Sequence, residues 1–190
     1  MRKVLFFFGQ LNDDDVEWML ANGAARTLPE QGVLIQQGVV SDSVFIVLEG
    51  RLAVWLKPRR GPEREIARLG AGEIVGEMSF VDARPPSATV RALEESTVFA
   101  VPKAALSARL AANEGFAARF YRALAIFLST TVRERHRAIG FGTDIGPEGP
   151  GEEPGGQEED EADELDATVL DGVYLAGERF NRMVRRVIVS

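Results

Sequence analysis

Two hydrophobic periodicities divide the chain. Residues 12–23 place Val16, Met19 and Leu20 on one helical stripe, and Asn12 or Asp13 precedes this stripe as a candidate N-cap. From residue 26 to 101 the apolar residues instead form short runs separated by glycine-containing turns, a pattern typical of β-strands. These runs are 33–35, 44–48, 52–56, 66–69 and 98–101. Many short strands at this spacing predict a compact barrel or roll, although the spacing alone does not name the fold.

Helical spacing returns after Pro102, a residue that is tolerated in the first turn of a helix. Asn113 and Glu114 interrupt this region, and residues 115–138 predict a second, longer helix. Its apolar stripe consists of Phe116, Phe120, Leu124, Phe127 and Leu128. The stripe packs on the strands or contacts a second copy of the chain, and the pattern leaves both alternatives open.

The C-terminal quarter differs from the rest in composition. Residues 140–166 are rich in Gly, Pro and Glu, and they predict a disordered acidic linker between a domain at 1–139 and a helix at 167–190. This last helix places apolar residues on one face and arginines on much of the remainder; the apolar positions are Val169, Val173, Ala176, Phe180, Val184 and Val187. Docking on its own domain or on a protein partner fits this pattern better than a membrane surface, because the arginines are few.

Charge and composition exclude several functional classes. The net charge is −7, but residues 1–145 carry 18 Lys and Arg against 17 Asp and Glu, so the acidity belongs to the tail. No concentrated basic surface is predicted, and we expect no nucleic-acid partner. The chain has no cysteine and one histidine, His136, which argues against disulfides and metal sites. No apolar run is long enough to span a membrane, and we expect a cytoplasmic protein.

The most informative stretch lies at residues 72–80 and 84–90. It predicts a short strand, a tight glycine turn, one helical turn and the start of another strand. Glycines allow main-chain amides to approach a ligand closely, and a helix N-terminus attracts an anion. Glu77 lies beside this turn, where its carboxylate accepts hydrogen bonds from ligand hydroxyls.

This stretch resembles the phosphate-binding cassette of cyclic nucleotide-binding domains, as in catabolite-activator-like regulators and the regulatory subunits of cyclic-AMP-dependent kinase. The resemblance covers roughly residues 5–138. It implies a mainly β fold with flanking helices: an eight-stranded jelly-roll-type β-roll, a short N-terminal helix and C-terminal helices. It also implies that helix 115–138 closes over the nucleotide base and forms a homodimer interface.

The resemblance assigns a ligand-binding role to the cassette residues. Glu77 corresponds to the glutamate that binds the ribose hydroxyl, and main-chain amides near Ala88 and Thr89 correspond to phosphate donors. The family arginine that pairs with the cyclic phosphate falls at Pro86, while Arg84 lies two positions earlier as an alternative cation. The candidate site comprises Gly76, Glu77, Met78, Ser79, Arg84, Ser87, Ala88 and Thr89.

Pro86 shapes the expected function, because losing a charge-assisted phosphate contact costs about 10-fold to more than 100-fold in affinity. We therefore expect a regulatory module with weak or lost binding of cyclic AMP or cyclic GMP, which acts through its C-terminal helices on a protein partner. The alternative is a docking protein with an empty pocket. A transcription regulator requires a helix-turn-helix unit that the tail does not predict. The lone histidine argues against a metal-dependent enzyme, and no enzymatic activity is expected.

Overall fold

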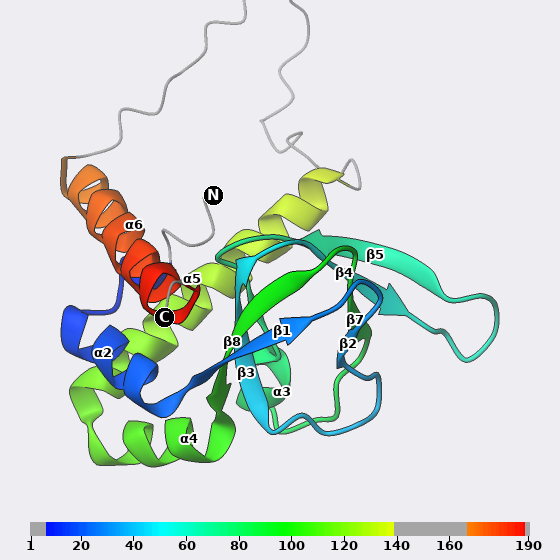
Figure 1. Ribbon diagram of the computed structural model, residues 1–190, viewed down its shortest axis with the longest axis horizontal. Coiled ribbons are helices and arrows are strands. Elements are labelled where there is room, and N and C mark those ends of the chain that lie inside the picture. Colours follow the sequence, from blue (N-terminus) through cyan, green and yellow to red (C-terminus); the bar gives the residue numbers. More distant parts are fainter. Residues whose placement is uncertain (1–6, 139–166, 189–190) are drawn as a thin grey trace, which may run out of the picture.

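Two four-stranded antiparallel sheets form the centre of the molecule (Figure 1). The structure is a computed structural model that describes residues 7–138 and 167–188. The first sheet has the order β1 (Ala24–Leu28), β8 (Ser96–Pro102), β3 (Ser43–Glu49) and β6 (Ile74–Val75). The second has the order β2 (Val33–Ile35), β7 (Thr89–Ala92), β4 (Leu52–Leu56) and β5 (Arg64–Leu69). The predicted fold class, an eight-stranded β-roll with flanking helices, is confirmed.

Strands β3 and β8 contribute to two separate hydrophobic cores. Phe45 and Val47 of β3 face the core between the sheets, whereas Ile46 packs with the helices on the opposite face. In β8, Val98 faces the core between the sheets, and Phe99 packs with the helices. Because side chains alternate along a strand, a strand covered on both faces is apolar at nearly every position, as residues 44–48 are.

Helix α2 (Asp13–Asn22) begins at a capping box, as the polar residues before its apolar stripe predict. The Asp15 main-chain N–H donates to Asn12 Oδ1 at 2.9 Å, and the Asn12 N–H donates to Asp15 Oδ2 at 2.9 Å. The Asp15 carboxylate also accepts hydrogen bonds from Arg119 Nε and Nη2, at 2.6 and 2.8 Å. One buried carboxylate therefore caps α2 and fastens it to the helix that carries Arg119.

Two consecutive helices follow β8. Pro102 is the N-cap of α4 (Lys103–Ala112), and α5 (Glu114–Ala138) follows directly. The break at Asn113 is confirmed, since its Oδ1 accepts a hydrogen bond from the Phe116 N–H at 2.8 Å. The predicted stripe of α5 faces the helical core; Phe116, Phe120, Leu124 and Phe127 are all buried. A short helix, α3 (Glu77–Val81), contacts α5 through the ring of Phe80 against that of Phe120.

Helix α6 (Ala167–Ile188) packs on the domain that precedes it, beside α2 (Figure 1). Ala176 and Met183 are completely buried, and the ring of Phe180 meets that of Phe8 edge-on at 5.8 Å. Val184 and Val187 pack against the same core. Of the docking alternatives left open by the sequence, the structure shows docking on the chain's own domain. Val169 and Val173 lie where side chains are not described, and the predicted linker at 140–166 lies outside the described residues.

Arginine–carboxylate pairs join α6 to α2 along one edge. Arg179 Nε donates to Asp13 Oδ1 at 2.8 Å, and Arg179 Nη1 donates to the carbonyl oxygen of Phe8 at 3.1 Å. Glu17 pairs with Arg186, and Arg182 lies within 3.8 Å of Asp13 and 3.7 Å of Glu17. The hydrogen bond from Arg179 lowers the pKa of Asp13 below its ordinary value.

Within the described ranges, no helix combines the length and apolar character that crossing a membrane requires.

Candidate functional site

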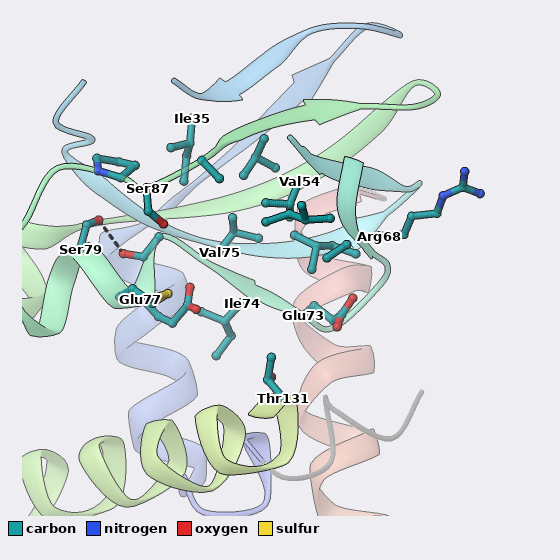
Figure 2. Close-up of a pocket in the computed structure, with 18 of the residues that line it drawn as sticks. Ile35, Val54, Arg68, Glu73, Ile74, Val75, Glu77, Ser79, Ser87 and Thr131 are labelled. Carbon is teal, nitrogen blue, oxygen red and sulfur yellow. Dashed lines mark hydrogen bonds between the residues drawn. The ribbon is translucent and has the colours of Figure 1, made fainter. Parts of the chain in front are cut away.

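A cavity of about 390 Å³ lies between the β-roll and α5 (Figure 2). Its walls are mostly apolar and come from distant parts of the chain: β2, β4, β5, β6 and β7 provide the roll side, and α5 provides the other side. The apolar lining includes Ile35, Val54, Ile66, Leu69, Ile74, Val75, Val90 and Phe127. This volume lies within the range typical of small-molecule sites.

The glycine turn at the cavity edge is built as its sequence predicts. Gly76 has a φ of +88°, and a Cβ atom added there would lie 3.2 Å from the Ser43 carbonyl oxygen and 3.3 Å from Ile35 Cδ1. Both the left-handed conformation and the close approach favour glycine. The turn leads from β6 directly into α3, which places Glu77 and Ser79 on the cavity wall.

Polar groups occupy several places on this wall. Ser79 Oγ donates to the Gly76 carbonyl oxygen at 3.0 Å, which Figure 2 shows as a dashed line. Thr131 Oγ1 donates to the Phe127 carbonyl oxygen at 3.0 Å, on the side formed by α5. Glu73 Oε2 accepts a hydrogen bond from the Gly70 N–H at 2.7 Å. The cavity therefore offers hydroxyls and carboxylates around an apolar interior.

Six of the residues predicted for the site line the cavity together: Gly76, Glu77, Met78, Ser79, Ser87 and Ala88. Thr89 is buried beside them, where its Oγ1 accepts a hydrogen bond from the Gln37 N–H at 3.1 Å. Arg84 lies apart from the lining, with 83% of its side chain exposed and its Nε 3.9 Å from Asp82 Oδ2. The ligand-binding role of these residues remains a prediction.

Carboxylates outnumber basic side chains among the residues that line the cavity. Pro86 lines the cavity at the position to which the resemblance assigns the phosphate-binding arginine. Arg68 is the one basic residue among the described lining residues, and its guanidinium points away from the cavity toward Glu65, at 2.7 Å (Figure 2). Glu73 and Glu77 contribute the negative charges. The described wall thus presents no inward-pointing guanidinium to an anionic ligand.

Lys103 lies directly behind this wall. Its Nζ donates to Ser79 Oγ at 2.7 Å, and its main-chain N–H donates to the Asp42 carbonyl oxygen at 2.7 Å. Desolvation on burial lowers the pKa of Lys103, while the negative charges of Asp42 and Glu77 act in the opposite direction. Lys103 could not be predicted as a site residue, because no local sequence pattern connects it with the cassette.

Thr131 was also missed. It lies one helical turn after Phe127, which belongs to the predicted apolar stripe. The expected closure of helix 115–138 over the ligand is the one signal from which Thr131 could have been predicted. Across the part of the chain that the structure describes, no group of three His, Cys, Asp or Glu side chains is placed to hold a metal ion.

The sequence of residues 25–113 matches the model of a protein family, the cyclic nucleotide-binding domain. This chain contains a cyclic nucleotide-binding domain. The chain is 30% identical over 94 residues to the cyclic AMP receptor protein of Thermus thermophilus, a match that covers 50% of this chain and 44% of that protein. It is 31% identical over 81 residues to the cAMP-activated global transcriptional regulator CRP of Salmonella typhimurium, which covers 42% of this chain and 39% of that protein.

Solved structures agree with the fold. A cyclic nucleotide-binding domain from Methylobacillus flagellatus superposes with a TM-score of 0.66 at 23% identity, covering 76% of this chain and 86% of that one. This likeness concerns the fold alone. The chain spans less than half the length of the two relatives from Thermus thermophilus and Salmonella typhimurium.

Proposed function

We propose that this chain is a regulatory module that binds cyclic AMP or cyclic GMP weakly, and that acts through its C-terminal helices on a protein partner. The observation that carries the proposal is a cavity of family type whose wall has Pro86 at the expected arginine position. The size of the cavity supports binding of a small molecule, and a proline at the position that the resemblance assigns to the arginine supports a weak contact with its phosphate.

Helix α5 provides a route from the cavity to the rest of the molecule. Phe127 and Thr131 line the cavity, while Phe116 and Phe120 of the same helix belong to the core against which α6 packs. A ligand that favours one position of α5 therefore changes the surface available to α6. This continuity supports a sensing role without any catalytic step, and the module is proposed to be non-enzymatic.

Dimerisation through α5 belongs to the same proposal. The exposed face of the helix carries Ala118, Tyr121, Ala125 and Val132 beside Arg122 and Ser129, and its apolar members suit packing against a second copy. The proposal predicts a molar mass in solution twice that of a single chain, measured by light scattering.

A docking protein with an empty pocket is the second candidate. It is favoured by Tyr174 and Leu175, which are 70% and 46% exposed on the outer surface of α6. Large exposed apolar side chains of this kind mark interaction surfaces. In this case a partner contacts the outer face of α6, and the cavity takes no part.

Calorimetric titration of the full chain with cyclic AMP and with cyclic GMP separates the two candidates, with Arg84→Ala measured in parallel. We expect dissociation constants between about 0.01 and 0.1 mM, because the loss of the arginine removes one to two powers of ten from a micromolar site. Arg84→Ala should change them less than twofold, since Arg84 points into solvent. A submicromolar affinity, or its loss in Arg84→Ala, would contradict the proposal, and no heat at millimolar ligand would favour the docking protein.

A further inference from the structure

Lys103 is the first residue of α4, and its ammonium lies behind the cassette rather than in solvent. The side chain is half-buried, and its hydrogen bond to Ser79 Oγ measures 2.7 Å. Ser79 itself lines the cavity. The cation is therefore one side chain away from the cavity, although Lys103 and Ser79 are 24 positions apart in the sequence.

The position of this lysine is unfavourable for the helix that carries it. A cation in the first turn of a helix is repelled by the positive end of the helix dipole. Burial adds a second cost, and it lowers the pKa of Lys103 despite the nearby charges of Asp42 and Glu77. The charges of Asp42 and Glu77 offset part of this cost, and the result is a positive charge held beside a ligand cavity.

The hydrogen bonds connect the ammonium with the cassette turn. Lys103 donates to Ser79 Oγ, and the same hydroxyl donates to the carbonyl oxygen of Gly76 at 3.0 Å. An ammonium has three N–H donors, and Ser79 uses one of them. By contrast, Arg84 and Arg68 direct their guanidinium groups toward Asp82 and Glu65, outside the cavity.

We propose that Lys103 is the cation that selects anionic ligands in this cavity, with its charge acting electrostatically from behind Ser79. The inference rests on the proposed function and names the ligand class of the same site: a nucleotide that carries a phosphodiester anion, preferred over the uncharged nucleoside. A lysine is a point charge and lies behind Ser79, so it replaces a bidentate arginine only in part. This accounts for weak rather than absent binding.

The test compares a charged and an uncharged ligand on matched variants of the full chain. Cyclic AMP and adenosine are titrated calorimetrically into wild type, Lys103→Met, Lys103→Arg and Lys57→Met. Lys57→Met removes the same charge from an exposed position and is the control. Methionine keeps the length and apolar stem of lysine, which limits the structural change.

We expect Lys103→Met to weaken cyclic AMP binding about tenfold and to leave adenosine binding within twofold. Lys103→Arg should restore most of the cyclic AMP affinity, and Lys57→Met should change neither ligand. A parallel loss of both ligands in Lys103→Met would mean that Lys103 only supports the fold. Equal effects of the two methionine variants on cyclic AMP binding would also overturn the inference, as would equal wild-type affinities for cyclic AMP and adenosine. Neither result would contradict the proposed sensing function. If neither ligand binds wild type at millimolar concentration, the sensing function and the role of Lys103 both fail.

Discussion

At the scale of single residues, Asp15 has several structural roles at once. Its side chain is 1% exposed, and it accepts the Asn12 N–H of the capping box together with two hydrogen bonds from Arg119. The same carboxylate raises the pKa of Arg119 through its hydrogen bond. Removing it leaves both a main-chain donor and a guanidinium without this acceptor, which is more costly than losing one contact.

We predict that Asp15→Ala lowers the free energy of unfolding by about 2–3 kcal/mol, somewhat less than a fully buried pair would cost because water reaches part of Arg119. Asp14→Ala is the matched control, since Asp14 is an exposed neighbour in the same helical turn, and it should change stability by less than about 0.5 kcal/mol. Urea unfolding followed by circular dichroism measures both. A loss below about 0.5 kcal/mol in Asp15→Ala would show that the buried carboxylate contributes little to stability.

At the scale of elements, the sequence predicted the strands and helices whose side chains face a core. The strands at 33–35, 44–48, 52–56, 66–69 and 98–101 are present, as are the helices before and after them. Strand β1 was not predicted, because four of its five residues are exposed and carry no apolar alternation. On α6, Met183 was left out of the predicted apolar face, although it is completely buried.

The contact between α6 and α2 combines buried apolar groups with exposed ion pairs. Exposed pairs contribute little individually and are screened by salt. Arg179 differs from the others, since only 12% of its side chain is exposed and it also binds the Phe8 carbonyl oxygen. Local opening of such a peripheral helix requires less free energy than unfolding of the whole domain.

We predict that α6 separates from the domain more readily than the β-roll unfolds. Because the chain has no cysteine, Met183→Cys and Val98→Cys each introduce a single buried thiol, one under α6 and one between the sheets. Thiol labelling of Met183→Cys should be at least tenfold faster, and 0.5 M salt should accelerate it further without affecting Val98→Cys. Equal labelling rates in the two variants would mean that α6 opens only when the entire domain unfolds.

At the scale of the whole molecule, the shape of the cavity and its charge have different origins. The cavity wall joins five strands to α5, so it depends on the packing of the complete roll. Sequence reasoning located the cassette, because glycine and small residues there form one local pattern. It did not locate the contributions of Val54 and Thr131, or Lys103 behind the wall, since these meet the cassette only through long-range packing.

We infer that a single position, Pro86, separates this cavity from one that binds cyclic nucleotides tightly. Pro86 lines the cavity, whereas its neighbour Pro85 is exposed, so Pro86→Arg and Pro85→Arg add the same charge inside and outside the site. The most direct measurement is calorimetric titration of both variants and wild type with cyclic AMP. We expect at least a tenfold gain in affinity for Pro86→Arg and less than a twofold change for Pro85→Arg. No gain in Pro86→Arg, or the same gain in both variants, would contradict it.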